Sequence, residues 1–240
     1  MKKLLGILAI AFLGFNAGAA SAATVNLVTN GGFETTTNGG GKFSTVNGTT
    51  VATGWTSTGY TYIYTATGGD TNNYLQLWGP KNGSANGLTA SPTGGNYIGS
   101  DGVWQAGPLS QTINNLIIGQ TYVLSFDWAG AQQNGFTGAT TEAWQVSLGD
   151  ETYTTQYLSN LSHGFTGWTS STFTFTATAV SEVLSFLAKD TPSGVPPFSL
   201  LDNVSLVAAV PEPGTLSVML LGALALFGVA MARRRTASKL

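Results

Sequence analysis

The sequence contains no cysteine and a single histidine, His163. Disulfide bonds are therefore excluded, and transition metals are poor candidates because their protein sites rely on thiolate and imidazole ligands. A catalytic triad of serine, histidine and aspartate would have to use His163, and no nucleophile-elbow motif is present. The adjacent acids Asp150 and Glu151 are expected at a hairpin tip, where sequence neighbours point apart and cannot act as a glycosidase pair. We therefore predict that the protein is not an enzyme, with a hydrolase as a less favoured alternative.

Charged residues are also scarce, at 8% of the chain, and most of the basic ones lie at its two ends. The middle of the chain keeps three lysines against ten acidic residues, which leaves that part with a net charge of −7. Such a surface repels phosphate groups, so nucleic acid is excluded as a partner.

The N-terminus carries an export signal. Lys2 and Lys3 precede an apolar stretch, Leu4 to Phe15, and the sequence Ala20-Ser21-Ala22 follows. This arrangement is typical of a secretory signal peptide over residues 1–22, with cleavage before Ala23. The exported part, residues 23–209, is long enough to bury a substantial core in one domain.

The C-terminal residues 210–240 combine three features. Pro211-Glu212-Pro213 ends any preceding strand, because proline has no N–H group and a fixed φ. An uncharged apolar run from Thr215 to Met231 follows, and then Arg233, Arg234 and Arg235. The run predicts a short transmembrane helix over about residues 215–232, and the arginines predict a cytoplasmic C-terminus.

This ordered combination resembles the PEP-CTERM protein-sorting signal of Gram-negative bacteria. The resemblance covers about thirty residues of the chain and rests on Pro211, Glu212, Pro213, the short apolar span and Arg233 to Arg235. It implies recognition by an exosortase-type processing enzyme, transient anchoring in the inner membrane, removal of the tail, and delivery to the cell surface or extracellular matrix. A permanent single-span anchor is the alternative.

The exported part has the composition of a β-protein, rich in Thr, Ser, Gly, Asn and aromatic residues. Apolar side chains alternate with polar ones in several short runs separated by turn residues, which predicts a two-sheet β-sandwich. The clearest runs are 60–64, 121–128, 144–148, 173–177, 184–188 and 204–206. The Gly-rich stretches 35–53 and 79–95 predict mobile surface loops.

Three sequence elements resemble the jelly-roll modules of the galactose-binding-like and carbohydrate-binding superfamily. They are Asn30-Gly-Gly-Phe33-Glu34, then Gln111-Thr-Ile113 followed by Gly119-Gln-Thr-Tyr122-Val-Leu-Ser-Phe126, and finally Leu201-Asp202-Asn203-Val204-Ser205-Leu206. The first element departs slightly from the family pattern Asn-Gly-x-Phe-Glu, because Asn30 is followed by two glycines before Phe33. The resemblance covers nearly the whole exported part and implies an all-β jelly-roll sandwich.

The same resemblance implies a structural calcium ion. Glu34 lies in the first element and Asp202 in the last, and the first and last strands of a jelly roll are neighbours. Ca²⁺ binds six to eight oxygen ligands, which these carboxylates and carbonyls of the Asn30–Gly32 turn could supply in part. The alternative is a hydrogen-bonded carboxylate pair without a metal.

Aromatic residues are the candidates for sugar binding, since flat rings stack on pyranose rings. Trp128 and Trp144 alternate in phase with apolar neighbours and are expected in the core. Trp78 and Trp104 lie beside loops, so we select them as ligand-binding candidates, together with Tyr74 and Gln76.

The prediction is therefore an exported, non-catalytic module that binds a glycan or exopolysaccharide. The main alternative is a structural or adhesive matrix protein without a defined ligand. Ice binding through the threonine-rich run Ser171 to Thr178 is less favoured, because threonine is common on exposed strands.

Overall fold

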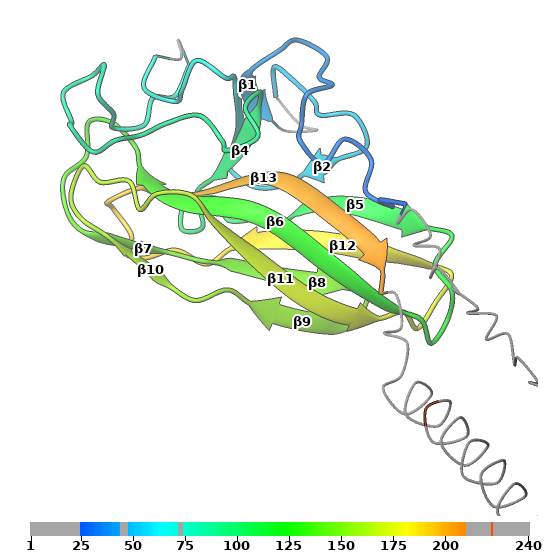
Figure 1. Cartoon of the computed structure of the whole chain (residues 1–240). Helices are drawn as coiled ribbons and strands as arrows, with labels where there is room; N and C mark the ends of the chain where they lie inside the picture. The colour runs from blue at the N-terminus through cyan, green and yellow to red at the C-terminus, as the bar shows by residue number, and fades with distance from the viewer. Residues whose placement is uncertain (1–24, 44–47, 72–73, 210–221, 223–240) are drawn as a thin grey trace, which may run out of the picture.

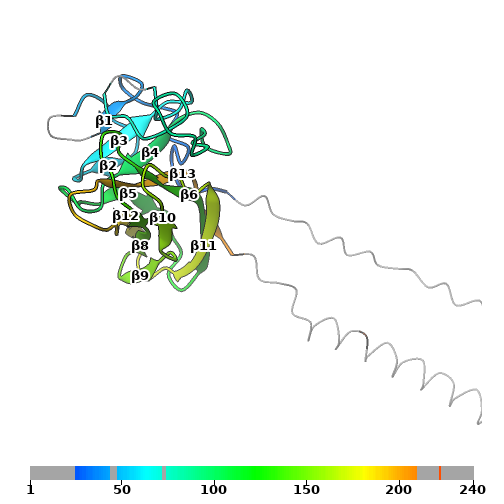
Figure 2. The ribbon, with the colours of Figure 1, turned by 90° about the vertical axis from the view of Figure 1, so that its left-hand side faces the viewer.

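A computed structural model describes residues 25–43, 48–71, 74–209 and 222. Every regular element within residues 25–209 is a β-strand, and two antiparallel sheets lie face to face (Figures 1 and 2). The sandwich predicted from the alternating pattern is thus confirmed. The expected signal peptide and sorting tail lie outside the described residues, apart from Gly222. Within the part of the chain that is described, no helix has the length and apolar character needed to cross a membrane.

The first sheet has six strands in the order β1-β3-β4-β13-β6-β11. Its strands are β1 (Gly41–Phe43), β3 (Thr61–Tyr64), β4 (Tyr97–Ser100), β13 (Pro197–Ala208), β6 (Thr121–Gln132) and β11 (Thr169–Thr176). The second sheet has five strands in the order β2-β5-β12-β8-β9. Its strands are β2 (Thr56–Ser57), β5 (Leu109–Asn114), β12 (Ser181–Ala188), β8 (Trp144–Leu148) and β9 (Glu151–Thr154). A small ribbon pairs β7 (Thr140–Glu142) with β10 (Leu158–Asn160).

The main core lies between the two sheets. Trp128 of β6 and Trp144 of β8 are both fully buried in it, as their phase in the sequence predicts. The Trp144 indole also donates a hydrogen bond of 3.0 Å to the carbonyl oxygen of Leu200 in β13, which ties one sheet to the other. A buried indole N–H generally finds such a partner.

A second core covers the outer face of the six-stranded sheet. Leu75, Leu77 and Leu88 from the connection between β3 and β4 pack there against Tyr64 and Tyr97. The expectation of a mobile surface loop over residues 79–95 is therefore wrong for Leu88, which is buried. As a result, β3 and β4 are buried on both faces.

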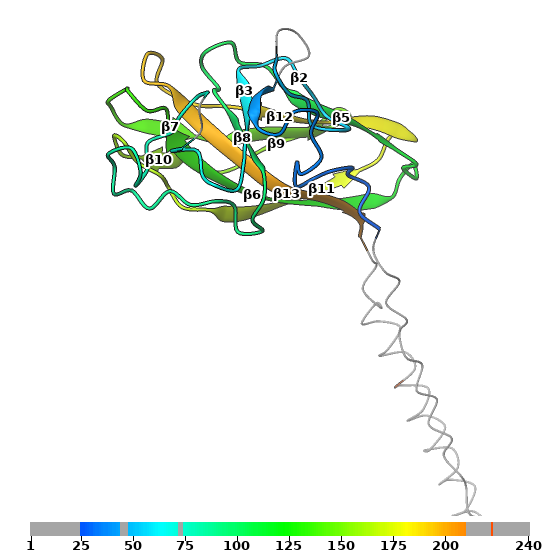
Figure 3. The same ribbon diagram turned by 90° about the horizontal axis from the view of Figure 1, so that it is seen from above.

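The two ends of the domain lie together. Leu27 donates its N–H to the carbonyl oxygen of Leu206 at 2.8 Å, although residues 25–30 form no strand. Residue 25 and residue 209 consequently lie at the same end of the sandwich (Figure 3). The opposite end, where β4 and β6 end and β13 begins, carries the hollow described next.

Candidate binding groove

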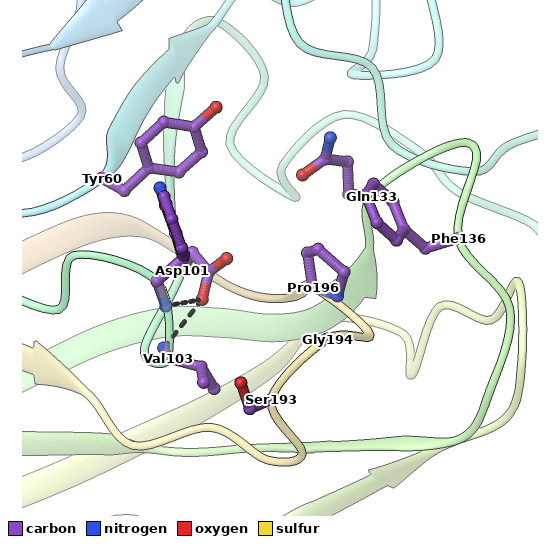
Figure 4. Close-up of a pocket in the computed structure, with 9 residues that line it drawn as sticks. Tyr60, Asp101, Val103, Gln133, Phe136, Ser193, Gly194 and Pro196 are labelled. Carbon is purple, nitrogen blue, oxygen red and sulfur yellow. Dashed lines mark hydrogen bonds between the residues drawn. The ribbon is translucent and has the colours of Figure 1, made fainter.

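The hollow is formed by two adjoining cavities that share Tyr60 and Gln133. The first, of about 330 Å³, is lined by Tyr60, Asp101, Val103, Trp104, Gln133, Phe136, Ser193, Gly194 and Pro196 (Figure 4). The second, of about 470 Å³, is lined by Tyr60, Tyr62, Tyr74, Leu75, Gln76, Gln133 and Asn134. We call the two together the groove. It combines aromatic faces with side-chain amides, which can donate and accept hydrogen bonds.

Trp104 is the most exposed aromatic of the groove, with 63% of its surface accessible. It lies in the turn after β4, and Asp101 fixes that turn by accepting the N–H groups of Val103 and Trp104 at 2.7 and 2.9 Å. Tyr60 also holds the turn, since its N–H donates to the Gln105 carbonyl oxygen at 3.0 Å and its own carbonyl accepts from Asp101 N at 3.0 Å. The indole is therefore exposed on a well-anchored backbone.

A second buried carboxylate lies beneath this turn. Asp190 accepts the N–H of Gly102 at 2.8 Å and the hydroxyl of Ser199 at 2.7 Å. The pKa of Asp190 is raised to about 7, mainly by burial and to a smaller extent by the charge of Asp101, while these hydrogen bonds lower it. Burial also raises the pKa of Asp101. Gly102 is required here, because a Cβ at this position would lie 2.7 Å from the Ala188 backbone.

The predicted residues Tyr74 and Gln76 line the second cavity, so the structure brings them to the same groove as Trp104. Tyr74 is 40% exposed and lies parallel to Tyr62, with ring centroids 6.0 Å apart. Its hydroxyl donates to the Ile63 carbonyl oxygen at 2.7 Å, and burial raises the pKa of Tyr74 to about 12. The phenol thus stays neutral at physiological pH.

Trp78, the other predicted residue, does not line the groove. Its ring lies against His163, with centroids 4.0 Å apart, and its Nε1 donates to the Phe136 carbonyl oxygen at 2.9 Å. His163 is only partly exposed. Trp78 is thus hydrogen-bonded to the backbone of Phe136, a residue that lines the groove.

The predicted carboxylates Glu34 and Asp202 meet elsewhere, beside the Gly31–Gly32 turn. A Cβ placed on Gly32 would lie 3.7 Å from Asp202 Oδ1 and 3.9 Å from Glu34 Oε1. Asp202 Oδ2 accepts hydrogen bonds from Ser91 and Thr93, but the buried Oδ1 has no hydrogen-bond partner. Burial raises the pKa of Asp202 to about 6, and the charge of Glu34 adds to this effect.

An oxygen that is buried without a partner suits a cation, and carboxylates are the ligands that Ca²⁺ prefers. Few oxygen atoms of the protein are available there as metal ligands, however. The Asn30 carbonyl already accepts from Phe33 N and Trp55 Nε1, and the Gly31 carbonyl accepts from Val204 N. Over the described residues, no group of three or more Asp, Glu, His or Cys side chains is arranged to hold a metal. The structure thus brings two carboxylates together here, and the calcium ion stays a prediction.

The sequence reasoning missed Tyr60, Asp101, Gln133, Asn134 and Phe136 as groove residues. Only Asp101 carried a local signal, because an aspartate followed by glycine is typical of a turn in which the carboxylate binds backbone N–H groups. The others are brought together by strand pairing between segments far apart in the chain.

A family model described as "Protein of unknown function (DUF642)" matches residues 26–206, and a model of the PEP-CTERM protein-sorting motif matches residues 209–235. The second match confirms the sorting signal predicted from Pro211–Pro213 and Arg233–Arg235. No curated protein matches the chain.

Several solved structures are similar to this chain at low sequence identity. TmCBM61, solved in complex with β-1,4-galactotriose, is 16% identical over 77% of this chain and 99% of its own, with a TM-score of 0.44. The CBM22-1 xylan-binding domain from Paenibacillus barcinonensis Xyn10C is 12% identical over 80% of this chain and 100% of its own, with a TM-score of 0.41. The enzymatically active domain of bacteriophage CBA120 tailspike protein 4 is 16% identical over 77% of this chain and 21% of its own, with a TM-score of 0.36.

Proposed function

The chain belongs to the DUF642 family through residues 26–206, and from its groove we propose that the exported domain is a non-catalytic glycan-binding module. The PEP-CTERM motif indicates export and sorting to the cell surface or extracellular space. The ligand class we propose is a polysaccharide of that compartment, such as an exopolysaccharide of the matrix.

The observation that carries this proposal is the exposed indole of Trp104, which lies on a hydrogen-bonded turn beside the side-chain amides of the groove. The apolar face of a pyranose ring can stack on a flat indole, while Gln133, Gln76 and Asn134 can bond its hydroxyl groups. A backbone turn that is already ordered before binding loses little conformational entropy when the ligand arrives. The groove is open and elongated over two cavities, which suits a chain of sugars.

The groove residues provide one carboxylate, which favours binding of a glycan over its hydrolysis. Glycosidases need two carboxyl groups flanking the scissile bond, about 5 to 9.5 Å apart. Of the residues that line the two cavities, Asp101 alone has a carboxylate, and its Oδ1 is bound to two backbone N–H groups. Asp101 therefore acts as a support for the Trp104 turn.

The sorting motif supports two further partners. An exosortase-type enzyme would recognise Pro211-Glu212-Pro213, and the inner membrane would hold the apolar segment 215–232 until the tail is removed. In this scheme the domain passes through a membrane-anchored precursor before it reaches the surface or the matrix.

We also propose that Glu34 and Asp202 bind a structural Ca²⁺ ion. The unpartnered Oδ1 of Asp202 supports this proposal, because a cation would satisfy it and offset the repulsion between the two carboxylates. When bound, the ion would fix the N-terminal segment against β13.

Glycan-array binding and titration of the secreted protein test the proposed ligand class. Trp104→Ala should weaken binding to the best glycan by about 2 kcal/mol, or roughly thirtyfold, as expected of a buried aromatic anchor. Tyr157→Ala is the matched control, since Tyr157 is 57% exposed and does not line the groove. Equal binding by Trp104→Ala and wild type would rule out the groove as the site, and no binding to any glycan would favour a structural matrix protein.

A further inference from the structure

Three large apolar side chains project into solvent at the end of the sandwich opposite the groove. Ile117 and Ile118 lie in the turn between β5 and β6, and Val180 lies in the turn between β11 and β12. Their exposed fractions are 66%, 63% and 62%. The two turns touch, because Leu116 donates its N–H to the Val180 carbonyl oxygen at 3.0 Å. We call Ile117, Ile118 and Val180 the apolar tip.

The turn that presents the two isoleucines is firmly hydrogen-bonded. Ile117 N donates to the Tyr122 hydroxyl at 2.9 Å, and Gln120 N donates to the Ile117 carbonyl oxygen at 3.0 Å. Gly119 adopts a φ of 80° and donates to the Ala177 carbonyl oxygen at 2.8 Å. This backbone keeps the isoleucines apart from the core that lies directly beneath them.

The turn that carries Val180 is held in a similar way. The Glu182 carboxylate accepts the N–H groups of Thr178 and Ala179 at 2.7 and 2.9 Å. The side chain of Glu182 is itself buried. Both turns therefore expose apolar side chains from fixed backbones.

The apolar tip lies beside the point where the chain leaves the domain. Ala209 N donates to the Thr121 carbonyl oxygen at 2.9 Å, and Gln120 Nε2 donates to the Ala209 carbonyl oxygen at 3.3 Å. Residue 209 is thus hydrogen-bonded to Gln120 and Thr121, which lie in the same connection as the two isoleucines and at its junction with β6. The end of β13 and this connection lie at the same end of the sandwich (Figure 1).

The chain beyond residue 209 places this end close to a membrane. Residues 210–214 can span at most about 18 Å when fully extended. The uncharged apolar run then begins at Thr215, and Arg233 to Arg235 follow it. When this run is inserted in a bilayer, the apolar tip can reach the lipid headgroups.

We propose that the apolar tip docks onto the surface of the lipid bilayer in which the sorting tail is inserted. No charged residue lies within 114–122 or 176–181, so entry of these turns into the interface has no charge to desolvate. The tether supplies a high effective concentration, so a small apolar contact is enough. Asp150, in the turn between β8 and β9, and Glu151, the first residue of β9, lie at the same end and limit the contact to a shallow one.

Docking has two consequences for the anchored precursor. It holds residues 210–214, with the Pro-Glu-Pro motif, at the membrane surface, where a membrane-bound processing enzyme can reach them. It also directs the groove away from the membrane, since Trp104 and the apolar tip lie at opposite ends of the sandwich. Neither consequence depends on the ligand that the groove binds.

The absence of cysteine allows a direct test on the full chain, inserted by its own tail into phosphatidylethanolamine and phosphatidylglycerol vesicles. Single variants Ile118→Cys and Val180→Cys carry an environment-sensitive dye, and Leu161→Cys is the matched control. Leu161 is 80% exposed and follows β10 at the opposite end of the domain. An interfacial apolar surface enters about 5–10 Å into the headgroup and acyl boundary. The dyes at 118 and 180 should therefore shift to shorter wavelength and be quenched by lipids spin-labelled near the headgroup, and the dye at 161 should not.

Three results would overturn the proposal. The first is equal emission and quenching at 118, 180 and 161. The second is a shift at 118 and 180 that disappears when each vesicle carries a single chain, because the tip would then contact a second copy of the protein. The third is a full chain that does not float with the vesicles, because the tail would then not bring the tip to a bilayer.

Discussion

Asp101 accepts the backbone N–H of Trp104 at 2.9 Å, so one buried carboxylate fixes the most exposed tryptophan of the groove. Replacing Asp101 by alanine leaves the N–H groups of Val103 and Trp104 without their acceptor, at a cost of about 1–3 kcal/mol. We expect Asp101→Ala to loosen the turn and weaken glycan binding by about tenfold, which is about 1.4 kcal/mol. Titration calorimetry with the glycan selected on the array measures this change.

Asp101→Asn provides the control for this prediction. The amide oxygen of asparagine can still accept both N–H groups, so most of the affinity should remain. If Asp101→Asn loses as much affinity as Asp101→Ala, the carboxylate contacts the ligand directly and does not act only through the turn.

The contact between Trp78 and His163 should contribute to stability. Trp78 is partly buried, and we expect Trp78→Ala to cost about 2 kcal/mol, less than the roughly 3–5 kcal/mol for a fully buried tryptophan. For a domain of this size this corresponds to a fall in Tm of about 4–8 °C. His163→Ala should also lower Tm, and the two effects should not add, because each variant removes the same ring contact. Additive losses in a double-mutant cycle would show that the two rings stabilise the protein independently.

The sequence allowed the sandwich to be predicted because several strands, among them β5, β8 and β12, bury one face more than the other. In β8, the inward residues Trp144, Val146 and Leu148 alternate with Gln145 and Ser147, and this alternation is visible without a structure. The C-terminal sorting signal could also be predicted, because charge, apolar length and proline position are local properties of the sequence.

The second core could not be predicted in this way. Tyr64 and Ile63 are both buried, on opposite faces of β3, and a strand covered on both faces shows no alternation. Its cover comes from a Gly- and Asn-rich connection whose composition is typical of exposed loops. The groove was predictable only in part, because the turn that carries Trp104 is held by a hydrogen bond from Gly102 N to Asp190, and these two residues are 88 positions apart along the chain.

Calcium should stabilise the domain through Asp202 and Glu34. We expect Ca²⁺ to raise Tm and EDTA to lower it, and Asp202→Asn should abolish this difference because the amide removes the negative charge and places a donor in the site. Differential scanning fluorimetry with and without Ca²⁺ measures the effect. Asp127→Asn is the control, since both Asp127 oxygens already have partners, Ser170 and Asn203. It should lower Tm without changing the response to Ca²⁺. An unchanged Tm of the wild type in EDTA would exclude the metal.

The raised pKa values of two buried acidic side chains predict that the domain loses stability as the pH rises. Burial raises the pKa of Glu142 to about 8 from 4.5 and that of Asp190 to about 7 from 3.8. The unfolded chain releases these protons at lower pH, so the folded state binds more protons between about pH 4 and 8. The free energy of unfolding must therefore fall as the pH rises through this range. Thermal unfolding at saturating Ca²⁺, which removes the contribution of Asp202, measures the slope.

Glu142→Gln isolates one of these two contributions. Glu142 is fully buried, and its Oε2 has no hydrogen-bond partner, so ionisation leaves an uncompensated charge in the interior. The neutral glutamine avoids that charge. The variant should match the wild type in Tm near pH 5, where the folded wild type keeps Glu142 protonated, and exceed it near pH 9. Asp150→Asn, at an exposed turn, should leave the slope unchanged. A Glu142→Gln variant that loses Tm with pH as steeply as the wild type would mean that Glu142 is already ionised at neutral pH and finds compensation within the fold.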